Sequence, residues 1–201
     1  MNKSVITLGV IGVLLLLLVM NGCNSYNKMV DLNEKVTESW QQVENQYQRR
    51  MDLIPNLVST VQGYADFEKS TLREVIDARS NAFGVKVDPN NLDPESLQKF
   101  AQAQNNLSGA LGRLMVLVER YPDLKANQGF SDLRIQLEGT ENRIATARQD
   151  FNTNVKDLNV LVQRFPSKIW AGIFGFEKRA YFESKDGAEN APEVNSTLNN
   201  G

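Results

Sequence analysis

The 201-residue sequence contains no histidine and a single cysteine, Cys23. The lack of histidine excludes histidine-based acid–base catalysis and catalytic triads. Together with the lone cysteine, it also excludes any metal site built from histidines or several cysteines of one chain, and an intramolecular disulfide cannot form. A net charge of −2 provides no basic field for a phosphate backbone, so we expect no nucleic-acid partner. The composition therefore favours a protein without catalytic activity, cofactor or metal.

The first feature present is a long apolar run, Val5 to Met20, interrupted by only one threonine and two glycines. As a helix this run reaches about 24 Å, short of the roughly 30 Å hydrocarbon core of a bilayer, whereas Ser4 to Cys23 would reach it. Such a length is typical of an uncleaved membrane helix or of a signal peptide. The Gly22-Cys23 junction resembles a bacterial lipoprotein signal, in which the Cys23 thiol takes the lipid, although Met20 and Asn21 fit that signal poorly.

Both interpretations attach the chain to a membrane, so we assign residues 1–25 as an N-terminal membrane anchor or, alternatively, a lipoprotein signal with Cys23 as its lipidation site. Lysines lie on both sides of the apolar run, and the positive-inside count is nearly balanced. The very short tail before the run is typical of a signal anchor. We therefore expect the bulk of the chain outside the cytoplasm, in the periplasm.

From Tyr26 onward, apolar residues recur every three and four positions, which is the period of one helix face. The series comprises Met29, Leu32, Val36, Trp40, Val43, Tyr47, Met51, Ile54, Val58 and Val61. It continues to the neighbourhood of Gly84. Pro55 removes a backbone donor inside this pattern, and because no cluster of turn residues surrounds it, a kink is favoured over a reversal. We expect one kinked helix over 26–83.

Two further helices follow. Asp93-Pro94-Glu95 is typical of a helix start, with an oxygen cap, a proline in the first turn and an acidic side chain beside it. This second helix ends at Tyr121-Pro122, and a third runs from Phe130 to Phe165, where Pro166 closes it. The predicted fold class is all-α: an antiparallel up-and-down bundle of three long helices over 26–182, or four if the kink at Pro55 divides the first. Residues 183–201 form a polar tail that we expect to be disordered.

A polar cluster surrounds the proline where the apolar face must continue. It comprises Arg49, Arg50, Asp52, Pro55 and Asn56. A kinked turn frees backbone groups that need partners, and four charged residues of the later helices could supply them: Glu119, Glu141, Arg143 and Arg148. Two interpretations stay open. These groups either form a buried network that fixes the register of the helices or are solvated surface charges.

The segment 165–182 holds six of the sixteen aromatic residues. One interpretation is a short amphipathic helix and a strand-like turn that close one end of the core. The other is a surface that contacts a membrane or a partner, with Trp170, Phe174 and Phe176 as the contact residues.

Many of these residues resemble the signature of the LemA family of bacterial membrane-anchored proteins. The first part of the resemblance comprises Tyr26-Asn27, Trp40, Arg49-Arg50, the run Asp52-Leu53-Ile54-Pro55-Asn56-Leu57-Val58, Gly63-Tyr64-Ala65 and Ala78-Arg79. The second part comprises Glu119, Tyr121-Pro122, Leu124-Lys125-Ala126, Phe130, Thr140-Glu141-Asn142-Arg143-Ile144, Ala147-Arg148 and Phe165-Pro166. Phe67 stands where a histidine is frequent in the family, which removes a titratable switch. The resemblance implies an N-terminal membrane helix that carries an all-α bundle, with no established enzymatic activity or cofactor.

Members of the family can be encoded near membrane metalloproteases, which suggests a partner role. We therefore expect a membrane-anchored helical scaffold or interaction protein of the bacterial envelope, without catalytic activity, whose partners are the membrane and another envelope or membrane protein. The alternative is an envelope-stress or lipid-interacting sensor that uses the aromatic segment 165–182.

Overall fold

The computed structural model describes residues 3–64, 68–89 and 91–182, with side chains from residue 8 onward. The described helices are α1 (Lys3–Gln62), α2 (Lys69–Gly84), α3 (Pro94–Val118), α4 (Pro122–Lys125), α5 (Gln128–Gln163) and α6 (Ser167–Phe174). The described part of the chain contains no strand, so the predicted all-α class is confirmed. The tail predicted over 183–201 lies outside the described residues.

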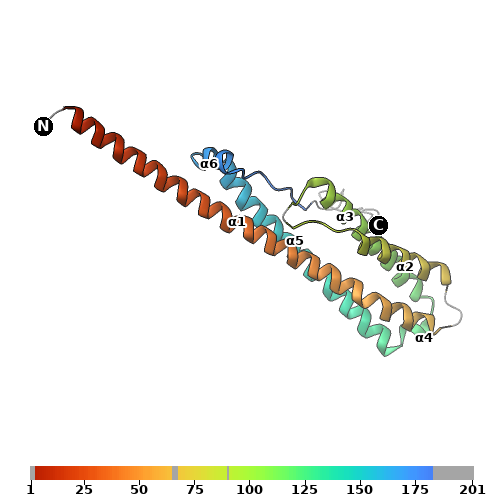
Figure 1. The fold of residues 1–201 in the computed structure, drawn as a ribbon. Coiled ribbons are helices and arrows are strands. Elements are labelled where there is room, and N and C mark those ends of the chain that lie inside the picture. Colours follow the sequence, from red (N-terminus) through yellow and green to blue (C-terminus); the bar gives the residue numbers. More distant parts are fainter. Residues whose placement is uncertain (1–2, 65–67, 90, 183–201) are drawn as a thin grey trace, which may run out of the picture.

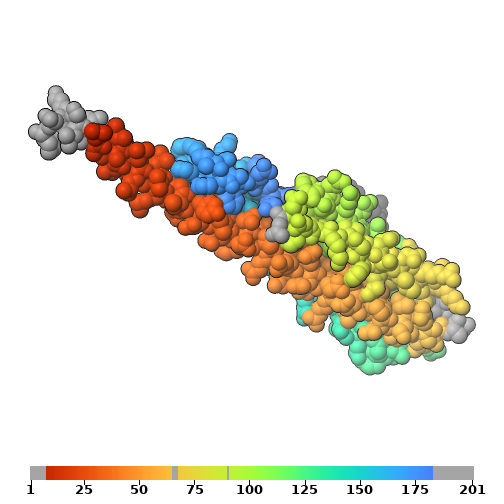
Figure 2. All heavy atoms as spheres, in the orientation of Figure 1, coloured from red at the N-terminus to blue at the C-terminus, as the bar shows by residue number. Residues whose placement is uncertain are grey.

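The helices form an elongated rod with α1 as its spine (Figure 1). Helix α5 runs antiparallel along α1 and makes the most extensive contact with it, whereas α2 packs mainly on α3. The short α4 lies at the far end of the rod, and α6 lies at the opposite end of the helical bundle, against α1 and α5. The first part of α1 projects beyond all other helices, as Figure 2 shows.

The projecting part of α1 is apolar and exposed. The large side chains from Leu8 to Met20 are each at least 48% exposed. Among the described residues, α1 is the one helix that is long and apolar enough to cross a membrane. It is a candidate membrane anchor, and it continues without a break into the bundle.

The predicted single helix over 26–83 is wrong, because the chain reverses after Gln62 and α2 begins at Lys69. Pro55 lies inside α1 and does not end it. The carbonyl of Met51, four residues before Pro55, lacks its usual helical donor. Arg79 of α2 supplies one, with its Nε 2.9 Å from the Met51 oxygen. The three- and four-residue spacing of apolar residues extends from α1 into α2 because each helix buries one face in the same apolar core.

The other helix ends follow the sequence signals closely. The Asp93 side chain accepts a hydrogen bond from the Ser96 amide at 2.9 Å, and hydrogen bonding by Ser96, first by its side chain and then by its amide, lowers the pKa of Asp93. The Asn127 side chain caps α5 in the same way through the Phe130 amide, at 3.0 Å. These caps satisfy amides that have no intrahelical partner.

The rod contains two separate apolar clusters. The proximal core, nearer the projecting end of α1, is built around Met29, Val36, Trp40, Val43, Tyr47, Leu97, Phe100, Ile144, Phe151, Val155, Leu158 and Phe182. The distal core is built around Met51, Ile54, Leu57, Val61, Leu72, Val75, Leu107, Leu114, Leu124, Phe130 and Leu137. Aromatic edge-to-face contacts link Trp40 to Phe100 and Phe151 in the proximal core. A buried arginine, Arg50, lies at the boundary between the two cores.

Candidate functional site

Arg50 is 3% exposed and projects from α1 into the middle of the bundle. Its Nη2 donates to the Gln104 side-chain oxygen at 2.8 Å and to the Gln104 backbone oxygen at 3.2 Å. Its Nη1 donates to Ser108 Oγ at 2.8 Å and to Glu141 Oε2 at 3.1 Å. A guanidinium has a fixed fork of donors, so one side chain joins α1, α3 and α5.

This arginine network lies at the boundary between the proximal and distal cores. On α1, Tyr47 belongs to the proximal core and Met51 to the distal core. The other two helices change core at the same level. On α3, Gln104 lies between Phe100 of the proximal core and Leu107 of the distal core, and on α5, Glu141 lies between Ile144 of the proximal core and Leu137 of the distal core. A polar layer of this kind penalises any slip of one helix along another, because a slip would leave buried donors unpaired.

Burial lowers the pKa of Arg50 from its ordinary value, and the neighbouring Glu141 and Tyr47 oppose that shift. The guanidinium nevertheless stays charged, because an arginine in a protein does not lose its proton at neutral pH. It also lies 5.0 Å from the centre of the Tyr47 ring, in a cation–π contact. Burial raises the pKa of Tyr47, and the positive charges of Arg148 and Arg50 counteract the increase.

The structure therefore brings two of the predicted network residues together, Arg50 and Glu141, and adds two that the sequence analysis missed, Gln104 and Ser108. Gln104 is fully buried. A signal for it existed, because it occupies the apolar stripe of α3 between Phe100 and Leu107. No comparable signal marked Ser108.

The remaining residues of the predicted polar cluster do not join the network. Arg49, Asp52, Pro55 and Asn56 are all exposed. The Asp52 carboxylate accepts a hydrogen bond from Gln48 on the same helix, at 2.7 Å.

The predicted partners on the later helices lie at several different places. Glu119 is exposed and forms an ion pair with Lys125. Arg143 is exposed at the edge of a groove, and half-buried Arg148 lies 4.4 Å from the centre of the Phe182 ring. The residue that reaches the freed Met51 carbonyl is Arg79, for which the sequence predicted no such role.

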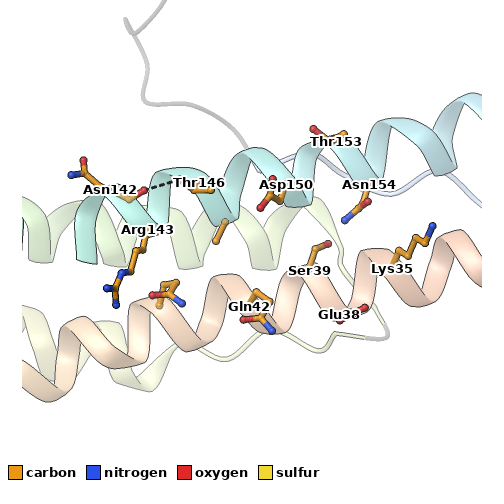
Figure 3. A pocket seen from close by; sticks show the side chains of 12 residues that line it. Lys35, Glu38, Ser39, Gln42, Asn142, Arg143, Thr146, Asp150, Thr153 and Asn154 are labelled. Carbon is orange, nitrogen blue, oxygen red and sulfur yellow. Dashed lines mark hydrogen bonds between the residues drawn. The ribbon is translucent and has the colours of Figure 1, made fainter. Parts of the chain in front are cut away.

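An open groove of about 770 Å³ runs between α1 and α5 (Figure 3). Its lining includes the small side chains of Ser39, Ala147 and Thr146. Its other lining residues carry both signs of charge and several amides: Lys35, Glu38, Gln42, Gln46, Asn142, Arg143, Asp150, Thr153 and Asn154. The buried side-chain oxygen of Gln46 accepts no hydrogen bond from the described residues. We define this feature as the α1–α5 groove; it was not predicted from the sequence.

The aromatic segment forms a second site at the proximal end. Trp170 Nε1 donates to the Asn21 side chain at 3.3 Å, and the ring packs on Gly22, where a Cβ atom would lie 2.9 Å from the indole. Phe174 contacts the ring of Tyr26 edge to face, with 4.9 Å between ring centres. The predicted amphipathic helix is thus present as α6, and exposed Cys23 lies beside it on α1.

After α6, the chain runs back along α5 in an extended conformation. Two asparagines of α5 hold it. Asn159 exchanges two hydrogen bonds of 2.9 Å with the backbone of Arg179, and Asn152 exchanges bonds of 2.8 and 2.9 Å with the backbone of Phe182. The Phe182 ring is thereby held in the proximal core. The strand-like turn expected here is an extended segment that is hydrogen-bonded to two side chains of α5.

The chain is similar in sequence to several known proteins. Two relatives are a magnetosome protein MamQ of Paramagnetospirillum magneticum and MamQ of Magnetospirillum gryphiswaldense, each 29% identical over 177 residues that cover 80% of this chain. The chain spans 65% of the length of these relatives. Protein LemA of Metamycoplasma hominis is 25% identical over 61% of this chain and 49% of its own length. The family model for the LemA family matches residues 39–195. Because that match takes in α2 to α6 and the arginine network, the chain belongs to the LemA family.

Proposed function

We propose that this protein is a membrane-anchored, non-catalytic interaction protein of the bacterial cell envelope. In this role it holds a protein-binding surface at a fixed distance from the bilayer. The observation that carries the proposal is the continuity of α1 from the exposed apolar segment to the far end of the rod. From Cys23 to Gln62 this helix extends about 60 Å, so its far end is held well outside the lipid headgroups.

The internal packing supports a rigid connection rather than a flexible tether. Helix α5 lies along α1, and the arginine network ties α1, α3 and α5 at one level. A contact made anywhere on the rod is therefore fixed in distance and direction relative to the anchor helix α1.

The α1–α5 groove is the surface that we assign to the partner, another envelope or membrane protein. Its walls offer charges of both signs and several amides. Such a lining suits the backbone and polar side chains of a polypeptide better than an apolar small molecule, which binds in enclosed apolar pockets. From Asn142 to Asn154 the groove follows α5 for about 18 Å, which matches five or six residues of an extended chain.

A photo-crosslinking amino acid at Gln42, in the groove, tests this assignment in intact cells. We expect one adduct of constant mass in the membrane fraction. The matched control is the same probe at Val160, an exposed α5 position outside the groove, which should give none. Equal labelling from both positions, or no adduct from Gln42, would exclude the groove as the contact surface. Recovery of the full-length chain wholly in the aqueous fraction would refute the anchored role itself.

We also propose that the anchor is retained rather than cleaved before Cys23. Cleavage would remove Asn21 and Gly22. Asn21 accepts the hydrogen bond from the Trp170 indole, and Gly22 packs against the indole ring, so both hold Trp170 on α1. Mass spectrometry of the purified amino terminus should therefore find Met1, with or without its formyl group. A diacylglyceryl group on Cys23 would show instead that the lipoprotein alternative is correct. Protease treatment of spheroplasts should digest the bundle, as expected for a periplasmic orientation.

A further inference from the structure

Helix α6 has an apolar face that no other part of the described chain covers. Phe165, just before the helix, is 79% exposed, Ile169 is 53% exposed and Ile173 is 63% exposed. Ile169 and Ile173 are spaced by four within the helix, so they lie along one face, which we call the α6 apolar face, and Phe165 is in the turn that leads into the helix. Ala171 is buried and Trp170 half-buried on the side that contacts α1 and α5. The helix is thus held on the rod by one side while its most apolar side faces outward.

The position of α6 along α1 coincides with the end of the membrane anchor. Trp170 is bonded to Asn21, the first polar residue after the apolar run. From Lys3 to Asn21 the helix extends about 27 Å, close to the thickness of the hydrocarbon core. Figures 1 and 2 show α6 beside α1 just where the projecting segment emerges from the bundle. An anchor that spans the bilayer therefore places α6 at the level where hydrocarbon gives way to headgroups.

The polar residues around α6 match that level. Exposed Arg164, Lys168 and Lys178 outnumber the one exposed acid of the segment, Glu177. Cations beside an apolar helix face are attracted to lipid phosphates while their aliphatic stems stay near the hydrocarbon. The half-buried indole of Trp170 adds an amphipathic ring of the kind enriched at membrane interfaces.

We propose that the α6 apolar face inserts into the headgroup–acyl boundary of the membrane that holds the anchor, so that the lipid bilayer itself is its ligand. The inference rests on the membrane anchor of the proposed function. Continuity with the anchor selects lipid over a protein partner, because any bilayer crossed by α1 already touches this level of the rod. A single membrane-spanning helix can tilt and rotate relative to the bilayer, whereas a second helix that is packed on it and lies in the interface fixes both the tilt and the rotation. α6 therefore sets the angle at which the rod leaves the membrane.

Tryptophan fluorescence tests the proposal in the intact chain, which has two tryptophans. The full-length protein is reconstituted into vesicles of phosphatidylethanolamine and phosphatidylglycerol, with bromine near the top or near the end of the acyl chains, and only protein that floats with the vesicles is measured. Because an interfacial helix lies about 5–10 Å into the boundary, we expect about twofold quenching of Trp170 by shallow bromines and less by deep ones. Trp40 is fully buried, about 28 Å from Asn21 along α1, and serves as the unquenched reference.

Two sets of variants identify the cause of the quenching. Trp170→Phe should leave an emission that bromine does not change. Ile169→Ser combined with Ile173→Ser should abolish most of the quenching, whereas Ile135→Ser, at a 58% exposed position toward the far end of α5, should leave it unchanged. Quenching that survives the double substitution would overturn the role of the α6 apolar face, as would floated protein whose Trp170 is not quenched. Failure of the chain to float at all would instead refute the anchor.

Discussion

Replacement of Arg50 by methionine tests whether the arginine network holds the rod together. Methionine fills a similar volume but donates no hydrogen bond, so the Gln104 side chain and backbone oxygen and the Ser108 hydroxyl all lose a partner. Gln104 is 2% exposed and cannot turn to water. A buried polar group without a partner costs about 1–3 kcal/mol.

The ion pair contributes much less than the buried bonds. Glu141 is 59% exposed and regains water when Arg50 is removed, so its loss is at the level of a surface pair, about 0–1 kcal/mol. The total loss for Arg50→Met is therefore about 3 kcal/mol. Arg50→Met combined with Gln104→Leu removes both buried partners and should recover most of this loss.

Urea unfolding of the full-length chain in nonionic micelles, followed by far-ultraviolet circular dichroism, measures the effect. With a slope of about 2 kcal/mol per molar urea, Arg50→Met should lower the midpoint by about 1.5 M. Arg49→Met is the matched control, because Arg49 is exposed next to it and its loss should stay within about 0.5 kcal/mol. The reasoning fails if Arg50→Met is no more destabilising than Arg49→Met, or if the Gln104→Leu double variant is less stable than Arg50→Met alone.

Three further predictions concern single contacts. Arg79→Ala should cost about 1–2 kcal/mol in the same urea assay, because the carbonyl freed by Pro55 loses its donor, and Arg79→Lys should recover part of this loss; equal stability of all three proteins would contradict this role. Because the pKa of Tyr47 is raised in the fold, the unfolded chain loses this proton first, near pH 10. Stability should therefore fall as the pH rises above about 10, and less steeply in Tyr47→Phe; parallel pH profiles would show that burial of Tyr47 is not responsible. Asn127→Ala should cost about 1 kcal/mol through the lost cap of α5, whereas Asn127→Asp should be neutral or slightly stabilising in thermal unfolding.

The sequence predicted what depends on local chemistry. The 3.6-residue apolar period identified the helical regions, and the Asp93 cap marked the start of α3. The sequence did not predict the reversal between α1 and α2. The spacing of apolar residues indicates which face of a helix is buried, but it does not indicate whether the chain has turned between two helices. Pro55 was read as the point of distortion, yet its effect is compensated by Arg79 on a helix whose position only the fold determines.

The candidate sites likewise divide into residues that local sequence patterns predicted and residues whose roles depend on the packing of distant helices. The buried network was one of two open interpretations of the cluster near Pro55, and Arg50 with Glu141 belongs to it, whereas Arg49 and Asp52 face solvent. Ser108 could not be anticipated, since its role depends on the crossing of α1 and α3. The α1–α5 groove likewise requires two surfaces far apart in the sequence. A short amphipathic helix was one of two open interpretations of the aromatic segment and is present as α6, but its partner Asn21 is separated from Trp170 by most of the chain.

Helix α1 carries the membrane anchor, the contact with α6 and the buried Arg50. The angles of these three features around the α1 axis are therefore fixed relative to one another. Successive residues of a helix are rotated by about 100°, so one residue inserted between Gly22 and Arg50 would turn the α6 contact by that angle relative to the arginine network. Helix α6 is also packed on α5, and α5 carries Glu141, so it cannot follow such a turn without breaking one contact or the other. The anchor and the bundle are therefore coupled through two connections, α1 itself and the path from α6 through α5. A rod with a single connection could tolerate that insertion, but this one cannot.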